Sequence, residues 1–246
     1  MRIKIRLSAE RPIALDYQYP LQLRALIYHL LPNDYAAYLH DTGFEYEKRR
    51  FKLFTFSRLF GHRIRSFGRA GKPLVFKNEV HFYLASPVSK ILEYVANESI
   101  RRTALRLGTN VVSLKSIEVE KEPIFPKRIK IQMLSPMTIR STLITADGKK
   151  KSYYYNPQEQ EFSELMRKNL EKKYQVVFKS ELKGDLAIIP LGRGKERILR
   201  GDRGFIIKAW DGFYELRGTP ELIQLSYSTG LGEKNSLGLG MWEEVI

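Results

Sequence analysis

Glycine residues near the end of the sequence are spaced so that backbone amides could bind phosphate groups. Gly230 and Gly232 form one Gly-x-Gly pair, and Gly238 and Gly240 form a second pair after a polar tip. Because glycine has no Cβ, the backbone there can approach a ligand closely, and Lys234 adds a positive charge beside it. Turns between helices and strands also collect glycine, so a plain turn is the alternative interpretation.

Other chemical motifs are missing from the sequence. The glycine loop is neither a G-x-x-x-x-G-K-[ST] P-loop nor a dinucleotide-binding G-x-G-x-x-G that opens a helix. There is no HExxH motif, no Ser-His-Asp signature and no carboxylate pattern typical of two-metal nucleases. The chain also contains no cysteine, which excludes disulfides and thiolate metal sites. We therefore expect neither a metal ion nor a cofactor.

The composition indicates a globular protein that binds a polyanion. The 246 residues include 42 Lys and Arg against 27 Asp and Glu, giving a formal charge of +15, while 43% are hydrophobic. The aromatic content of 12% favours nucleic acid over an anionic membrane, because bases stack on aromatic rings. No apolar run is long enough for a membrane span or a signal peptide, so no membrane association and a cytoplasmic location are expected. Solubility alone is the other explanation for the charge.

Hydrophobic periodicity divides the first half of the chain into strands and helices. Residues 1–7 alternate between apolar and basic types, which predicts a strand with one buried face. The connection at 58–72 is rich in basic residues and predicts a hairpin with a cationic tip. Ser86 as N-cap and Pro87 as first helical residue predict a helix. The predicted elements are strands at 1–7, 51–57, 74–76, 80–84 and 111–119, and helices from Pro20 to Pro32, from Asn33 to Gly43 and from Ser86 to Gly108.

The second half repeats the order of the first. A proline-containing break after Glu120 predicts a boundary between an N-terminal domain, 1–121, and a C-terminal domain, 122–246. Both halves have the order β-α-β-β-α-β, which predicts an α+β protein of two tandem ferredoxin-like, or RRM-like, domains. The predicted elements are strands at 129–133, 182–189 and 241–245, β-formers at 141–155 around an Asp147-Gly148 turn, a helix opened by Asn156 to Glu159, a hairpin with an Asp211-Gly212 turn, and a short helix capped by Thr219.

Three stretches resemble a known family. They are the N-terminal strand, the series Leu26-Ile27-Tyr28, Tyr38-Leu39-His40 and Lys52-Leu53-Phe54-Thr55, and the glycine loop with its tip Glu233-Lys234-Asn235-Ser236. Together they resemble the CRISPR-associated endoribonucleases of the RAMP superfamily, which cut CRISPR precursor transcripts within each repeat. The resemblance implies two ferredoxin-like domains with an RNA-binding cleft between them. It also implies CRISPR repeat RNA as partner, effector-complex subunits as further partners, and leaves monomer and homodimer both open.

The resemblance further implies cleavage without a metal ion. The ribose 2′-oxygen attacks the neighbouring phosphate and leaves a 2′,3′-cyclic phosphate and a 5′-hydroxyl, a reaction that uses a base, an acid and a cation. By resemblance, these are Tyr28, His40 and Lys52. Histidine suits proton transfer near neutral pH, whereas tyrosine needs a nearby cation such as Arg24 or Lys52 to act as a base. Alternatives are His29 for the acid and Lys48, Arg49 or Arg50 for the cation.

Plain structural roles compete with these assignments. Tyr28 could be a packed tyrosine, His40 a surface histidine and Lys52 a solvated charge, while His62 and His81 are interpreted as structural. A repeat-RNA-binding protein or ribonucleoprotein subunit that does not cut is the competing function, and a generic RNA-binding protein is disfavoured because no RNP1-like run occurs. The predicted RNA contacts, each of which could also be solvated surface, are Gly230, Gly232, Lys234, Asn235, Ser236, Gly238, Gly240, Arg58, Arg63, Arg65, Lys149, Lys150, Arg193 and Arg197.

Overall fold

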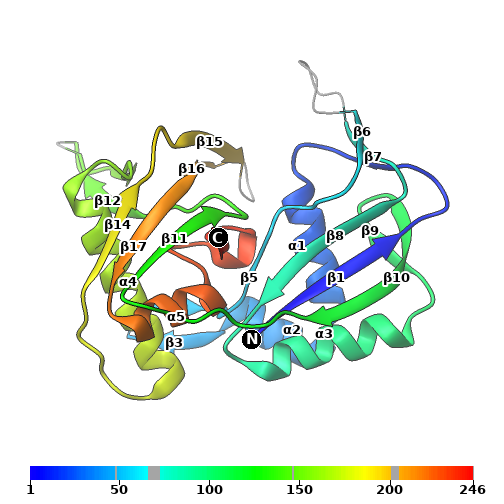
Figure 1. Ribbon diagram of the computed structural model, residues 1–246, viewed down its shortest axis with the longest axis horizontal. Helices are drawn as coiled ribbons and strands as arrows, with labels where there is room; N and C mark the ends of the chain where they lie inside the picture. The colour runs from blue at the N-terminus through cyan, green and yellow to red at the C-terminus, as the bar shows by residue number, and fades with distance from the viewer. Residues whose placement is uncertain (48, 66–72, 146, 201–204, 246) are drawn as a thin grey trace. The chain divides into compact units, whose positions relative to one another are not determined.

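A computed structural model of the chain describes residues 1–47, 49–65, 73–145, 147–200 and 205–245 (Figure 1). The chain divides into two units. One comprises Met1–Glu122 with Ser236–Gly238, and the other comprises Pro123–Asn235 with Leu239–Ile246. Ser236–Gly238 of the glycine loop, which the sequence-based division gives to the C-terminal domain, therefore group with the N-terminal unit, whereas Glu233, Lys234 and Asn235 belong to the C-terminal unit.

The N-terminal unit is built on a five-stranded sheet with the order β5-β8-β1-β10-β9. Ile3, Ile5 and Leu7 of the central strand are buried in its hydrophobic core, as the alternating pattern predicts. The core is closed by helices whose apolar residues pack against one face of the sheet. The elements are β1 (Arg2–Ser8), β5 (Thr55–Phe56), β8 (Glu79–Ala85), β9 (Leu105–Leu107), β10 (Asn110–Val119), α1 (Tyr19–His29), α2 (Asn33–Asp41) and α3 (Ser89–Arg101).

Short strands surround this sheet. The predicted hairpin across the connection 58–72 is only partly confirmed, because β5 pairs antiparallel with β8 and not with the strand at 74–76. The strand at 74–76 is not part of the five-stranded sheet. It pairs instead with the short strands at 13–15 and 63–65. Residues 66–72 of the predicted cationic tip lie outside the described residues. The additional strands are β2 (Ile13–Leu15), β3 (Phe44–Tyr46), β4 (Arg49–Phe51), β6 (Arg63–Arg65) and β7 (Leu74–Phe76).

The prediction of one strand over 51–57 is wrong. The chain leaves the extended conformation between β4 and β5, where Leu53 has a left-handed backbone with φ 53°. A buried hydrogen bond holds this turn, since Ser86 Oγ donates to the Leu53 carbonyl at 2.7 Å. The predicted role of Ser86 as helix cap is also wrong, because α3 begins later, with Val88 at its N-cap position.

The C-terminal unit has a four-stranded sheet with the order β14-β17-β11-β18. Helices α4 and α5 pack on it, and the order β-α-β-β-α-β confirms the predicted tandem ferredoxin-like fold. Within the described residues, no helix is both long and apolar enough to span a membrane. The elements are β11 (Arg128–Met133), β12 (Arg140–Ile144), β13 (Lys150–Tyr154), α4 (Gln160–Phe178), β14 (Leu186–Pro190), β15 (Lys195–Arg200), β16 (Ile206–Asp211), β17 (Phe213–Gly218), α5 (Pro220–Thr229), the 3-10 helix η2 (Asn235–Leu237) and β18 (Trp242–Glu244).

Two local predictions in this unit need correction. Asp211-Gly212 is not a hairpin turn: β16 pairs with β15, whereas β17 pairs with β14 and β11. Gly212, with φ 143°, instead carries the chain from one sheet into the next. Helix α4 begins at Gln160, not within Asn156 to Glu159 as predicted. The Asn156 amide does donate to the Glu159 carboxylate, as a capping box requires, but this bond lies in a turn before the helix.

The glycine loop that follows α5 is packed against the protein's own backbone. A Cβ added to Gly232 would lie 2.1 Å from the Thr138 carbonyl oxygen, and one added to Gly240 would lie 2.1 Å from the Leu231 carbonyl oxygen. A Cβ on Gly238 would lie 2.4 Å from the Phe56 ring. Three glycines of this loop are therefore required by internal packing, whatever ligand the loop binds.

Replacing Gly232 with alanine should destabilise the protein more than replacing Gly148, which lies in the turn between β12 and β13. Both glycines have a left-handed φ, 72° and 76°, so the backbone strain is similar, but the added Cβ at Gly148 meets nothing within 4 Å. We expect Gly232→Ala to lower the free energy of unfolding by about 1–3 kcal/mol more than Gly148→Ala, the usual cost of overpacking. Urea unfolding measures both, and equal losses would contradict the packing described here.

Candidate active site

The N-terminal unit brings the three predicted catalytic side chains together. Tyr28 lies on α1, His40 on α2 and Lys52 directly after β4. The rings of Tyr28 and His40 are 6.3 Å apart between centroids and nearly perpendicular. Lys52 Nζ donates a hydrogen bond to the His40 backbone carbonyl at 2.7 Å. Segments separated by 12 residues or more thus place a phenol, an imidazole and an ammonium in one neighbourhood.

Core packing fixes the position of each group. Tyr28 follows the buried Ile27 on α1, and its ring contacts the buried Phe54 with a centroid distance of 5.9 Å. His40 follows the buried Leu39 on α2, so its own side chain faces solvent and is 64% exposed. The left-handed turn at Leu53 separates Lys52, which reaches the site, from Phe54, which is in the core.

Tyr28 is electrostatically suited to donate a hydrogen bond. Burial raises the pKa of its phenol above the ordinary value, and this effect exceeds the opposing effects of the Arg24 charge and of a hydrogen bond with Arg24. The Arg24 guanidinium also lies over the Tyr28 ring, 5.5 Å from its centroid. Arg24 is therefore the cation that a tyrosine base would need, but the Tyr28 phenol keeps its proton at neutral pH.

Lys52 is part of a cationic cluster. Burial lowers the pKa of its ammonium, as do the charges of Arg50 and Arg24, while Asp41 opposes the shift. The Asp41 carboxylate also accepts a hydrogen bond from His40 Nδ1–H across 2.7 Å, so the imidazole is oriented by a carboxylate. A site with three clustered cations favours binding of an anion such as phosphate.

The alternative residues have other contacts. His29 Nδ1 lies 2.8 Å from the carbonyl oxygen of Ala25, one turn earlier on α1. Arg50 donates to the Asp41 carbonyl and pairs with Glu45, Arg49 is exposed on β4, and Lys48 lies outside the described residues. Among the residues that the structure describes, no three His, Asp or Glu side chains group as a metal site requires.

The predicted basic RNA contacts lie on separate segments. Arg58 follows β5, Arg63 and Arg65 belong to β6, and Lys150 is exposed at the start of β13. Lys149 pairs with Asp147, Arg193 is exposed before β15, and Arg197 pairs with Asp211 at 3.3 Å. Lys234 in the glycine loop lies over the Phe205 ring, with Nζ 4.6 Å from its centroid. Arg58, Arg63 and Arg65 thus belong to the N-terminal unit, and the other basic residues belong to the C-terminal unit.

Sequence reasoning missed an aromatic surface on the outer face of the N-terminal sheet. His81 and Tyr83 of β8 are partners of Arg6 and Lys4 on β1 in the strand register. The His81 ring stacks on Phe60 at 5.4 Å, and Lys4 Nζ lies 5.5 Å from the Tyr83 centroid. Burial first, and then Lys4 and Arg6, lower the pKa of His81, which favours the neutral ring. The alternation in Val80-His81-Phe82-Tyr83 could have predicted this surface, because it places His81 and Tyr83 on the same face of the strand.

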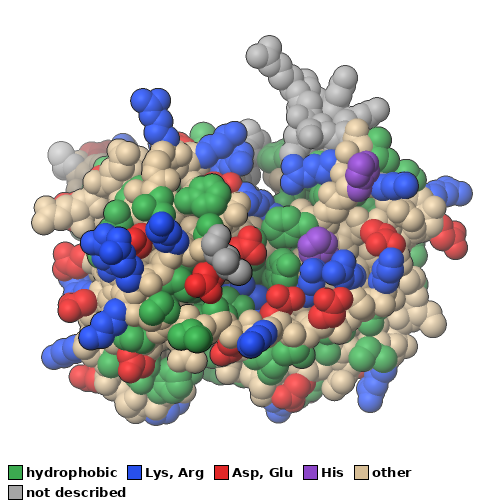
Figure 2. All heavy atoms as spheres, viewed as in Figure 1, with side chains coloured by type: hydrophobic (Ala, Val, Ile, Leu, Met, Phe, Trp, Pro, Cys, Tyr) green, Lys and Arg blue, Asp and Glu red, His purple; other side chains and the backbone are tan. Residues whose placement is uncertain are grey.

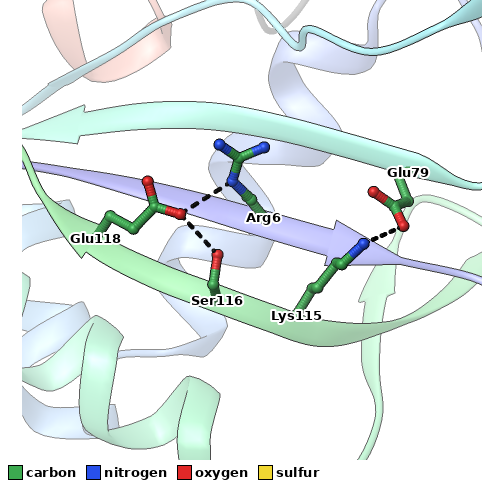
Figure 3. Close-up of polar contacts among 5 residues, drawn as sticks. All are labelled: Arg6, Glu79, Lys115, Ser116 and Glu118. Atoms are coloured by element: carbon green, nitrogen blue, oxygen red, sulfur yellow. Dashed lines mark hydrogen bonds and ion pairs between the residues drawn. The ribbon is translucent and has the colours of Figure 1, made fainter.

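Ion pairs border this outer face (Figure 3). Arg6 Nε donates to Glu118 Oε1 at 3.1 Å, Ser116 donates to the same oxygen, and Lys115 pairs with Glu79. Figure 2 shows histidine and charged side chains of both signs close together over this sheet. A cavity of about 270 Å³ lies at its edge, lined by Arg6, Gly61, His62, Lys77, Asn78, Glu79, Val80 and His81. The face combines rings, cations and carboxylates.

Comparison with known proteins gives the family. Two family models match the chain. The one described as "CRISPR-associated protein Cas6, N-terminal" matches residues 12–118, and the one described as "CRISPR associated protein Cas6, C-terminal" matches residues 119–244. The chain is 30% identical to the CRISPR-associated endoribonuclease Cas6 of Pyrococcus furiosus, covering 98% of this chain and 89% of the relative. It is 28% identical to CRISPR-associated endoribonuclease Cas6 1 of Methanocaldococcus jannaschii, covering 98% and 91%.

The folded chain gives the same result. A solved structure described as CRISPR associated protein Cas6 superposes with a TM-score of 0.82 and 25% identity, covering 100% of this chain and 99% of the other. The similarity thus extends over both ferredoxin-like units and includes the strands and helices that carry Tyr28, His40 and Lys52. The chain belongs to the Cas6 family of CRISPR-associated endoribonucleases.

Proposed function

We propose that this protein binds CRISPR repeat RNA in the cytoplasm and cuts the precursor transcript at the site formed by Tyr28, His40 and Lys52. Its membership of an endoribonuclease family supports RNA as substrate. The observation that carries the proposal is the proximity of the three groups, with Lys52 Nζ 2.7 Å from the His40 carbonyl and the His40 ring beside that of Tyr28. CRISPR effector subunits are proposed as further partners.

The proposed reaction is a transesterification within the RNA. The ribose 2′-oxygen loses its proton and bonds to the adjacent phosphorus, while the bond from phosphorus to the 5′-oxygen breaks and that oxygen gains a proton. The exposed imidazole of His40 can transfer a proton because it has a carboxyl partner in Asp41 and faces solvent, where RNA can reach it. Lys52, with Arg24 and Arg50 nearby, stabilises the negative charge that develops on the phosphate.

In this proposal Tyr28 positions the phosphate or ribose through its phenol hydrogen. The raised pKa argues against a phenolate base, since only a small fraction of Tyr28 would be ionised near neutral pH. A protonated phenol can donate a hydrogen bond to a phosphate oxygen. Proton abstraction from the 2′-hydroxyl then requires either His40 or a water molecule.

We further propose that the outer face of the N-terminal sheet contacts unpaired bases of the RNA. Rings of Phe60, His81 and Tyr83 beside Lys4 offer both stacking surfaces and a positive charge. Arg63 on β6 adds a cation that can bind phosphate. The glycine loop is proposed as a separate phosphate contact, through its backbone amides and Lys234. Sequence preference would then arise mainly from bases held in a single-stranded conformation.

Replacement of His40 should slow cleavage strongly. We expect His40→Ala to reduce the single-turnover rate by about 10²- to 10⁴-fold with little change in RNA affinity, because proton transfer is lost while the cations remain. His29→Ala is the matched control, since His29 is also an exposed histidine of the same unit but contacts the Ala25 carbonyl. A large loss in the His29 variant with normal His40→Ala cleavage would transfer the role to His29.

The charge of Lys52 should be visible in the pH dependence. Its lowered pKa means that the ammonium is protonated at low and neutral pH and loses its proton as pH rises, earlier than an ordinary lysine. The cleavage rate should therefore fall on the alkaline side. Lys52→Arg keeps its charge at high pH, so its normalised profile should extend to higher pH. Identical alkaline limbs for the two proteins would show that Lys52 ionisation does not control the rate.

Cleavage should proceed in EDTA and require the ribose 2′-hydroxyl. A 2′-deoxy nucleotide immediately upstream of the scissile phosphate should abolish cutting while binding persists, because the nucleophile is missing but the phosphates are intact. Gel analysis of repeat RNA and its deoxy analogue measures both properties, and the product ends should be a cyclic phosphate and a 5′-hydroxyl. Cutting of the deoxy substrate would exclude the proposed nucleophile, and binding of normal RNA without cutting would indicate a non-catalytic protein.

A further inference from the structure

A buried lysine lies beneath the glycine loop. Lys173 is on the second half of α4 and is only 2% exposed. The other buried residues of this helix are apolar, such as Phe162, Met166 and Leu170, except for Asn169. Lysine is rarely buried to this extent unless it has partners. A core role alone would favour an apolar side chain at this position, because removing an ammonium from water costs free energy.

The partners of Lys173 all belong to the glycine loop. Its ammonium donates to the carbonyl oxygens of Gly230 and Gly232 at 2.8 and 2.9 Å, and to Asn235 Oδ1 at 2.8 Å. An ammonium has three N–H groups, and these three acceptors use all of them. The loop backbone is therefore arranged around one cation.

Asn235 extends this arrangement to the other limb of the loop. While its oxygen accepts from Lys173, its amide nitrogen donates to the carbonyls of Leu231 and Leu239 at 3.1 and 3.0 Å. The Leu231 amide in turn donates to the Gly240 carbonyl at 2.8 Å. Lys173 and Asn235 thus connect the first part of the loop, Gly230 to Gly232, with its last part, Leu239 and Gly240. Loss of the ammonium would leave three acceptors unsatisfied at once.

We propose that Lys173 is a positioning residue for RNA binding, whose ammonium holds the loop Gly230–Gly240 in the conformation that receives the polynucleotide. This proposal rests on the proposed RNA-binding function of the loop. Lys173 itself, being buried, does not contact RNA. Its carbonyl partners face inward to the ammonium, which fixes the orientation of the intervening peptide groups and places Lys234 at the tip.

Charge and burial support this role. Burial lowers the pKa of Lys173 to about 7, and the Glu233 carboxylate opposes that shift. The lysine is thus kept in a costly environment next to the loop, and the free energy lost by burial is offset by hydrogen bonds that order the loop. A helix-packing role would need none of these bonds.

The test compares Lys173→Met with Val176→Ala. Methionine retains the volume but lacks the ammonium, whereas Val176 is buried on the same helix and its truncation weakens packing without removing a partner of the loop. We expect Lys173→Met to raise the Kd for repeat RNA about ten-fold or more and to increase trypsin cleavage after Lys234, measured by mass spectrometry below the unfolding temperature. Val176→Ala should retain affinity and protection.

Chemical rescue separates the ammonium from general damage. Because the chain has no cysteine, Lys173→Cys introduces a unique thiol that can be aminoethylated in the unfolded chain before refolding. Restoration of tight RNA binding by the aminoethyl group, but not by a neutral propyl group, is expected. Equal affinity of both adducts, or a Lys173→Met loss no larger than that of Val176→Ala, would overturn the proposal. If the wild type fails to bind repeat RNA, the proposed function is wrong and this proposal with it.

Discussion

The left-handed turn at Leu53 is the constraint on which the candidate active site depends. A β-prone stretch is interrupted there at a cost of roughly 1–2 kcal/mol for a non-glycine residue, and the Ser86 hydroxyl holds the Leu53 carbonyl in place. The turn sends Lys52 to the His40 carbonyl and Phe54 into the core under Tyr28. One backbone conformation therefore couples the cation of the site to the packing of the phenol.

The glycine loop follows a related logic in the C-terminal unit. Gly232 and Gly240 are required because backbone oxygens of the protein occupy the space that a side chain would need. This requirement holds whether or not a ligand binds there. Lys173 and Asn235 then connect the two limbs from inside. Both candidate sites are thus held by buried polar contacts with few alternatives, which is how a protein keeps reactive or binding groups in position before the substrate arrives.

Periodicity and family motifs predicted much of this structure, but only where local sequence decides the outcome. The alternation in β1 and the spacing in α1 located the core, and the motif positions of Tyr28, His40 and Lys52 converge in space. The interruption at Leu53 was not predictable, because Lys-Leu-Phe-Thr has strand propensity and the deciding partner, Ser86, is 33 residues away. Similarly, Asp211-Gly212 has the composition of a hairpin turn, and only the pairing of β17 with β11 shows otherwise. Lys173 has the local pattern of any helical lysine.

The carboxylates beside Arg6 and Lys115 have a consequence for the ionic strength dependence of association. Glu118 and Glu79 already neutralise these cations in the free protein. A nucleic acid that reached Arg6 or Lys115 would replace a carboxylate by a phosphate, so fewer condensed counterions would be exchanged per contact than for an unpaired lysine. The total of 42 Lys and Arg therefore overstates how steeply affinity falls with added salt. Stacking on the neutral rings beside these ion pairs then contributes a larger share of the binding free energy.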